Sequence, residues 1–199
     1  CNTLSSTAVE VIVPRITDQP DNANICIEFG QTNLSLTMIQ GAATLGYQWQ
    51  YNEGTSGTPD WQPVVNGTPN NVQYSGATTT SLDAQNFTNV GDYEYRCIIS
   101  VDVPASGGGT QSCTDIISAT AIITAAADPE ITTQPVGGTI CEGETFPLTV
   151  SASVDPPFVL SYQWQVSDTE LGTYTDVTSG TGGTTDSYTT PALTEDKWY

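Results

Sequence analysis

The string Tyr-Gln-Trp-Gln occurs twice in this chain, at 47–50 and again at 162–165. The chain has only four Trp residues, so an identical string around two of them indicates an internal repeat. Trp49 and Trp164 are 115 positions apart (164 − 49), about the length of one small β-sandwich domain. We therefore interpret each string as a strand that places its Trp in the core of such a domain.

Short runs of alternating apolar and polar residues surround both copies, for example at 34–38 and 148–152. Alternation with a period of two, β-branched residues and turn residues every ~8–12 positions are typical of β-strands. No stretch carries a convincing helical stripe, so the sequence predicts an all-β fold. Matched strands are predicted at Thr78–Leu82 and Thr184–Tyr188, and a last strand is predicted from Cys113 to Ala125.

The repeat also predicts the domain boundaries. Residues 1–13 match 113–125 in pattern, so we interpret them as the last strand of a preceding repeat. The Pro-bounded segment 14–20 recurs at 129–135, which makes 14–127 one complete domain and 128–199 a second domain that lacks its last strands. A repeat register that crosses both ends predicts a longer array. In an alternative interpretation, Cys1 is the lipid-bearing first residue of a mature bacterial lipoprotein.

The charge balance narrows the possible partners. The chain has 22 acidic residues, three basic residues and no His, for a net charge of −19. Nucleic acid and anionic membranes are disfavoured, because binding phosphate requires Lys and Arg. The commonest general base is missing, no isolated carboxylate pair suggests catalysis, and no apolar run approaches the ~18 residues of a membrane span. We expect that the chain is not an enzyme and that it holds no cofactor. Bound calcium is left open, because Asp and Glu supply the oxygen ligands that calcium prefers.

Several motifs occur in a characteristic succession: Ile-Thr-x-Gln-Pro, Ile-Cys, Tyr-Gln-Trp-Gln, Tyr-Ser-Gly-Ala-Thr-Thr at 74–79, and Tyr-x-Tyr-Arg-Cys at 93–97. This succession resembles the tandem immunoglobulin-like (Ig-like) repeats of very large Bacteroidota surface proteins, including SprB-type gliding-motility adhesins exported by type IX secretion. The resemblance implies tandem Ig-like β-sandwiches in an extracellular filament or stalk at the cell surface.

The resemblance implies that the partners are neighbouring repeats of the same chain, and further candidates are surface polysaccharide and the outer-membrane secretion or motility machinery. The competing interpretation is a carbohydrate-binding or accessory module of a secreted polysaccharide-degrading enzyme. A third is a polymerising subunit that continues by strand donation.

Six residues are the expected core positions of the two domains, and the resemblance also suggests a role for Tyr95. Tyr95 lies two residues before Cys97, where Ig-like domains carry a Tyr that hydrogen-bonds the adjoining corner. The expected core residues are Trp49, Trp164, Tyr95, Tyr199, Leu36 and Val150.

Five cysteines in a chain that looks extracellular suggest disulfides, and an odd count suggests partners outside it. Leu36 occupies the position of the usual second-strand cysteine, so the standard bridge to Cys97 should be absent. Cys26 could pair with Cys97, with Cys113, or with the hairpin cysteine of the next repeat. In an Ig-like topology Cys26 and Cys113 lie at opposite ends, beyond the ~7 Å Cα limit of a disulfide. The candidate disulfide cysteines are Cys26, Cys97, Cys113, Cys141 and Cys1.

Overall fold

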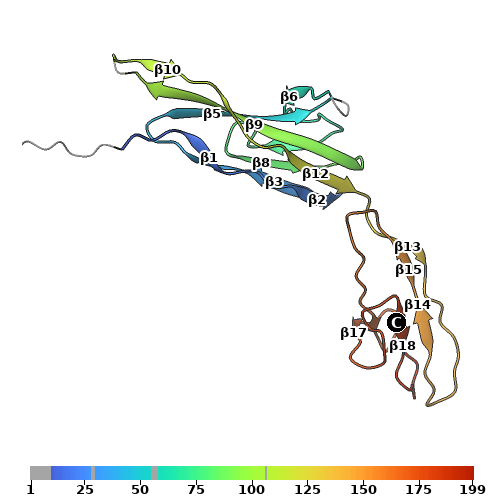
Figure 1. The fold of residues 1–199 in the computed structure, drawn as a ribbon. Coiled ribbons are helices and arrows are strands. Elements are labelled where there is room, and N and C mark those ends of the chain that lie inside the picture. Colours follow the sequence, from blue (N-terminus) through green and yellow to red (C-terminus); the bar gives the residue numbers. More distant parts are fainter. Residues whose placement is uncertain (1–9, 28–29, 55–57, 106) are drawn as a thin grey trace, which may run out of the picture. The chain divides into compact units, whose positions relative to one another are not determined.

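The computed structural model describes residues 10–27, 30–54, 58–105 and 107–199. All the regular elements in these residues are β-strands, so the predicted all-β fold is confirmed. The chain divides into two units between Ala126 and Ala127, and each unit is described by itself (Figure 1).

The first unit is a two-layered β-sandwich. Its strands are β1 (Arg15–Asp18), β2 (Ala23–Cys26), β3 (Gln31–Ser35), β4 (Thr37–Ile39), β5 (Thr44–Asn52), β6 (Trp61–Pro63), β7 (Gln73–Ser75), β8 (Ser81–Gln85), β9 (Gly91–Pro104), β10 (Thr110–Ser112), β11 (Ile116–Ile117) and β12 (Ala121–Ala126).

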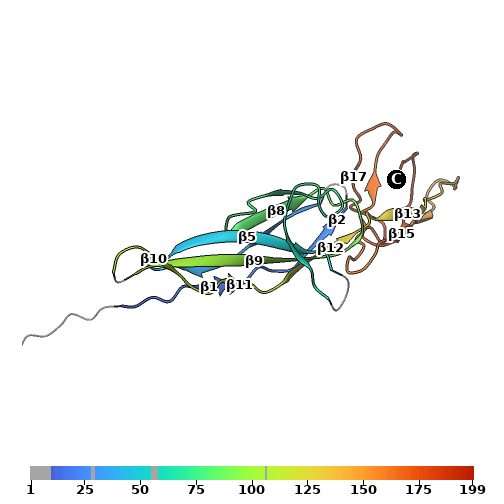
Figure 2. The ribbon, with the colours of Figure 1, turned by 90° about the horizontal axis from the view of Figure 1, so that it is seen from above.

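The strand order in the two layers is that of an Ig-like domain. One sheet runs β2-β12-β9-β5-β6, with β10 and β11 also paired to β9. The other layer contains β3-β8-β7 and the β1–β4 pair. Figure 2 shows the long strands β5 and β9 running side by side along the unit. The layer that contains β1, β3, β8 and β7 thus faces the layer that contains β5, β6, β9 and β12, as in the immunoglobulin sandwich.

The N-terminal part of the unit contributes to both sheets. β1 pairs antiparallel with β4, whereas β2 pairs parallel with β12. The chain crosses between the sheets at Pro20, which is buried and has no backbone N–H to donate to a ladder. The two layers are therefore linked at this edge by one continuous segment.

The core lies between the layers and follows the period of two. On β9 the side chains at 93, 95, 97, 99 and 101 are buried, while the intervening positions from 94 to 100 are more exposed. From the opposite layer Leu34 and Leu82, which are paired across β3 and β8, meet them fully buried. The alternation predicted from the sequence thus becomes one shared core.

The second unit repeats part of this plan. Its strands are β13 (Glu130–Thr133), β14 (Pro147–Thr149), β15 (Ser151–Ser153), β16 (Gln165–Val166), β17 (Thr175–Asp176) and β18 (Ser187–Thr189). The pairs β13–β15, β14–β18 and β16–β17 correspond to β1–β4, β3–β8 and β5–β6. Leu148, Trp164 and Tyr188 form its buried core. Among the described residues of this unit, a single antiparallel bridge between Ser167 and Trp198 stands in the place of the β5–β9 pair, and β12 has no counterpart.

Three of the predicted strands have different bounds in the structure. The strands predicted to begin at Thr78 and Thr184 begin at Ser81 and Ser187, because a turn precedes each of them. The predicted strand from Cys113 to Ala125 is divided into β11 and β12. Ser118 lies in the break, where its Oγ accepts a hydrogen bond from the backbone N–H of Cys97.

Candidate functional site

Each unit is built around one buried tryptophan. Trp49 has no exposed surface, and Trp164 is 7% exposed. The indole Nε1–H of Trp49 donates to the carbonyl oxygen of Thr79 at 2.9 Å, and that of Trp164 donates to Thr185 at 2.8 Å. A buried indole N–H needs such a partner, because leaving it unpaired costs about 1–3 kcal/mol.

The backbone around each tryptophan makes the same hydrogen bonds in both units. In each unit the backbone N–H of the Trp donates to the turn that precedes β8 or β18. The backbone carbonyl of the Trp accepts from the backbone N–H of a Val and from the side chain of the Gln that precedes the Trp. The four bonds in the first unit join Trp49 N to Ala77 O, Val64 N to Trp49 O, Gln48 Nε2 to Trp49 O and Trp49 Nε1 to Thr79 O; their counterparts join Trp164 N to Gly183 O, Val177 N to Trp164 O, Gln163 Nε2 to Trp164 O and Trp164 Nε1 to Thr185 O.

The turn that receives the indole is also the same in the two units. Gly76 has φ +80° and Gly182 has φ +88°, a conformation that favours glycine. The single O–H of Thr79 is shared between the carbonyl oxygens of Ser81 at 2.8 Å and Gly76 at 3.2 Å, and the O–H of Thr185 is shared in the same way between Ser187 and Gly182. The hydroxyl holds the turn closed, so that the Thr carbonyl points at the tryptophan.

We expect Trp49→Phe to destabilise the first unit by about 2–4 kcal/mol, because it leaves the Thr79 carbonyl unpaired and opens space in the core. Denaturant unfolding followed by circular dichroism measures the change. The control is Trp61→Phe: Trp61 is half-buried with the Arg96 guanidinium 4.3 Å from its ring centroid, so its loss should cost about 1 kcal/mol or less. Equal destabilisation by the two variants would contradict the role given to the indole N–H.

The tyrosine corner is made by a different residue from the one suggested by the sequence. The hydroxyl of Tyr93 donates to the carbonyl oxygen of Asn89 at 2.9 Å, four residues upstream. Tyr95 is fully buried, and its hydroxyl lies 2.9 Å from the hydroxyl of Tyr74 on β7. Burial raises the pKa of both Tyr74 and Tyr95. Tyr95 therefore joins the two sheets through Tyr74, and Tyr93 makes the corner bond.

The other expected core residues lie at corresponding places. Leu36 is 3% exposed within the core of the first unit, whereas Val150 is only partly buried beside that of the second. Tyr199 is also partly buried, with its ring centroid 5.5 Å from that of Tyr188. The backbones of Ser167 and Trp198 exchange hydrogen bonds of 2.8 and 2.9 Å, as paired strands do.

A hollow of about 440 Å³ lies beside this core in the second unit. Much of its lining is apolar or aromatic, and it includes Ile131, Val150, Leu160, Tyr162, Trp164 and Tyr199. In the first unit the corresponding side of the core is covered by β9 and β12.

Cys97 is a free, fully buried thiol in the core, on β9 opposite Trp49. Burial raises its pKa to about 11. Leu36, at the position where the second cysteine of the standard immunoglobulin bridge would stand, lies in the same core as Cys97. Because leucine has no thiol, that bridge is not made.

The register of the strands separates Cys26 from the other cysteines of the first unit. Cys26 is level with Ala126, next to the Ala125–Gly91 pair. Cys97 is six residues further along β9 from Gly91, about 20 Å at ~3.3 Å per residue, so a Cys26–Cys97 bridge is ruled out by the ~7 Å limit. The backbone N–H of Cys113 bonds Val101 O, still further along β9, which places Cys113 at the opposite end from Cys26. Cys141 is exposed, and Cys1 lies outside the described residues.

We expect iodoacetamide to alkylate the exposed Cys113 and Cys141 of the reduced native protein at pH ~8, and to leave Cys97 unmodified. Its raised pKa keeps Cys97 protonated, which alone slows alkylation by about 100-fold relative to a thiol of ordinary pKa, and burial slows it further. Peptide mass spectrometry measures the modification, with the denatured protein as the control for complete labelling. Alkylation of Cys97 at the rate of Cys113 would show that it is not a buried core thiol.

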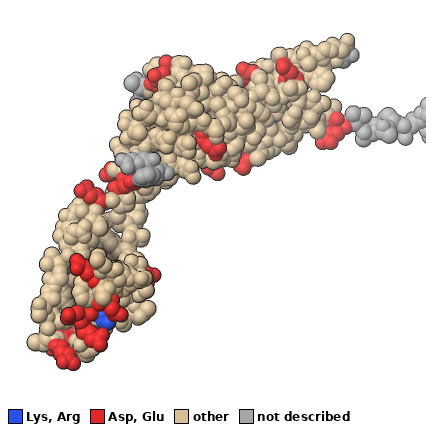
Figure 3. Space-filling model, turned by 180° about the vertical axis from the view of Figure 1, so that it is seen from behind, with Lys and Arg blue, Asp and Glu red and all other residues tan. Residues whose placement is uncertain are grey.

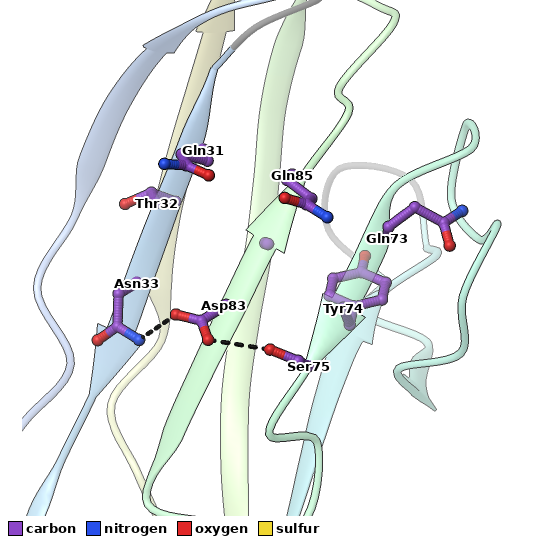
Figure 4. Close-up of a pocket in the computed structure, with 9 residues that line it drawn as sticks. Gln31, Thr32, Asn33, Gln73, Tyr74, Ser75, Asp83 and Gln85 are labelled. Carbon is purple, nitrogen blue, oxygen red and sulfur yellow. Dashed lines mark hydrogen bonds between the residues drawn. The ribbon is translucent and has the colours of Figure 1, made fainter.

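The outward face of the β3-β8-β7 sheet carries a polar hollow of about 440 Å³ (Figure 4). The strand register aligns its side chains in two rows that cross the three strands. One row is Gln31, Gln85 and Gln73, and the other is Asn33, Asp83 and Ser75. None of these residues was predicted as part of a site from the sequence, although their i, i+2 spacing on three strands was the available signal.

The second row is held together by hydrogen bonds. Asn33 Nδ2 donates to Asp83 Oδ1 at 2.7 Å, and Ser75 Oγ donates to Asp83 Oδ2 at 2.9 Å. These bonds, with that from Asn33 first, lower the pKa of Asp83. Asp83 is therefore a carboxylate with a fixed orientation at neutral pH.

The acidic residues are spread over the surface. Figure 3 shows Asp and Glu over the visible face of each unit, with little Lys or Arg among them. Asp18, Asp21, Asp128 and Glu130, which lie near the predicted linkers, are all exposed. In the described part of the chain, no three His, Cys, Asp or Glu residues are grouped as metal ligands. Nor do the described residues include a helix long and apolar enough to cross a membrane.

No model of a protein family matches the chain, and no curated protein sequence matches it. Similar solved structures include extracellular domains 3–5 of Drosophila OTK, at 17% identity and a TM-score of 0.46, over 91% of this chain and 53% of that one. The DIP-gamma IG1+IG2 structure has 16% identity and a TM-score of 0.33, over 90% and 83% of the two chains. Sidekick-1 immunoglobulin domains 1–4 have 13% identity and a TM-score of 0.36, over 90% and 41%. This chain thus spans about half the length of the OTK structure. The Ig-like assignment itself is carried by the strand order described above.

Proposed function

We propose that this chain is a structural segment of a cell-surface stalk or filament built from tandem Ig-like repeats. The observation that carries the proposal is the recurrence, bond for bond, of the tryptophan-centred hydrogen bonds in two successive units. A chain that repeats the same stabilising centre in this way is organised as an array of similar modules.

In this proposal residues 14–127 are a complete repeat, 128–199 are most of the next one, and 1–13 are the last strand of a preceding repeat. The match to 113–125 aligns Val11 with Ile123 and Val13 with Ala125, and both of these later residues are buried in the first unit. In contrast, Val11 is 86% exposed and Val13 is 66% exposed. Residues 1–9 lie outside the described part. The apolar hollow beside Trp164 similarly suggests that further strands cover the second unit. Neighbouring repeats of the same polypeptide are therefore the first partners.

The positions of the cysteines support a covalent staple between successive repeats. Cys26 is level with Ala126, where the chain leaves the first unit. Cys113 lies near the Thr44–Asp102 pair at the other end, which is also where β1 begins opposite Ile39. In an array stacked end to end, Cys26 of one repeat would face the hairpin cysteine of the next.

We expect non-reducing peptide mapping of the natural protein to find Cys26 joined to the hairpin cysteine of the following repeat. Cys97 should appear as a free thiol in the same map, which serves as the internal control. The pairing follows from the end-to-end positions of the two cysteines and the ~7 Å limit on a disulfide. Recovery of Cys26 as a free thiol in fully oxidised protein would reject the staple.

The surface chemistry supports an extracellular role for this stalk. A net charge of −19 makes neighbouring filaments repel one another and keeps them in solution. Together with the resemblance of its motifs to SprB-type repeats, this supports a Bacteroidota adhesin that is exported by type IX secretion and acts in adhesion or gliding motility. Surface polysaccharide or the outer-membrane secretion and motility machinery would then be its outside partners.

We expect antibodies raised against residues 14–127 to label intact cells that produce the protein, and immunogold electron microscopy to place the label along thin surface filaments. Protease added to the intact cells should remove the signal, because an extracellular stalk is accessible to it. A cytosolic enzyme of the same cells is the control and should be labelled only after permeabilisation. Labelling of the repeat that also requires permeabilisation would overturn the surface location.

A further inference from the structure

The polar hollow on the β3-β8-β7 sheet has the chemistry of a ligand site. We propose that this hollow binds a neutral oligosaccharide. The inference goes beyond the stalk proposal, because it concerns a single unit and does not depend on how many repeats the protein has.

The glutamine row offers hydrogen-bonding groups that the described residues leave unpaired. Gln31 and Gln85 are paired directly across β3 and β8, and neither amide has a hydrogen-bond partner among the described residues. Gln73 donates through Nε2 to Asn71 O at 3.0 Å, so its Oε1 remains an acceptor. Each amide presents both a carbonyl acceptor and an NH₂ donor, which matches a hydroxyl group that donates and accepts at once.

The second row supplies an acceptor that is already oriented. Asn33 and Ser75 each bond one oxygen of Asp83, while Asn33 also donates to Ser81 Oγ at 2.7 Å. A carboxylate has about four lone-pair positions, so Asp83 can still accept hydrogen bonds from ligand hydroxyls. Because its orientation is set before binding, little conformational entropy is lost when a ligand arrives.

The charge of the hollow selects against other ligands. Among the described residues that line it, Asp83 is the only charged one, and none is Lys or Arg. An anionic glycan would meet the Asp83 carboxylate and the acidic surface without a cation to offset them. A divalent cation would find one carboxylate whose two oxygens already accept hydrogen bonds, where it prefers several oxygen ligands.

The dimensions also fit a chain of hydroxyl-rich units. The two rows are two residues apart along the strands, about 7 Å, and the three strands together are about 10 Å wide. Figure 4 shows the two rows crossing the sheet, with Gln31, Gln85 and Gln73 in one row and Asn33, Asp83 and Ser75 in the other. The six side chains of the two rows are all polar, so they favour a ligand that presents hydroxyls to them over an apolar one.

We test this with the full chain and a panel of neutral oligosaccharides, namely cellohexaose, xylohexaose, mannohexaose and laminarihexaose, with hexagalacturonate as the anionic probe. Titration calorimetry should detect binding of at least one neutral sugar with a Kd below about 10 mM. Hexagalacturonate should not bind. NMR should show shifts of the Gln31 and Gln85 side-chain amides on titration. The double variant Gln31→Ala/Gln85→Ala should weaken binding at least about tenfold, because it removes two hydrogen-bonding amides.

The matched control is Gln111→Ala, since Gln111 is an exposed glutamine on β10, away from the hollow. It should bind as the unchanged protein does, and thermal unfolding should show that both variants are folded. The proposal is overturned if no neutral sugar in the panel binds, if binding survives the double variant, or if the NMR shifts map elsewhere. Equal binding of hexagalacturonate would also overturn it, because that would remove the charge selection.

Discussion

The hydrogen bond from the indole of Trp49 to the carbonyl of Thr79 is the contact on which the first unit depends. Burying a tryptophan removes a large apolar area from water, but its N–H must keep a partner. Because Trp49 is on β5 and Thr79 precedes β8, this bond helps to join the two layers of the sandwich. The second unit solves the same problem with Trp164 and Thr185.

The sandwich built around that contact decides what the outer surfaces carry. Alternate residues of β3 and β8 enter the core, so the residues between them face outward in register. On this sheet the outward set is polar and nearly uncharged, while the surface elsewhere is acidic. The same layered geometry places Cys26 and Cys113 at opposite ends of one unit, too far apart for a bridge within it.

Much of the fold was readable from the chain itself, since all-β structure follows from alternation and the duplicated Trp string marks both centres. The bounds of β8 and β18 were placed three residues early, because Thr79 and Thr185 are good strand residues that a hydrogen-bonded turn holds outside the strands. The corner bond was assigned to Tyr95 in place of Tyr93. Both tyrosines point inward on β9, and only the path of the chain before β9 determines which hydroxyl reaches a corner carbonyl.

The sequence by itself determined the repeat, the strand character and the acidic surface, because these depend on composition and on spacing along one strand. Only the tertiary structure decided which distant residues are neighbours. Gln31 and Gln85 are paired in one row, whereas Cys26 and Cys97, which an Ig-like plan made plausible partners, are separated by about 20 Å along the direction of β9. The physical reason is strand register: each pairing depends on how two strands slide past one another, and that is set by the shared core.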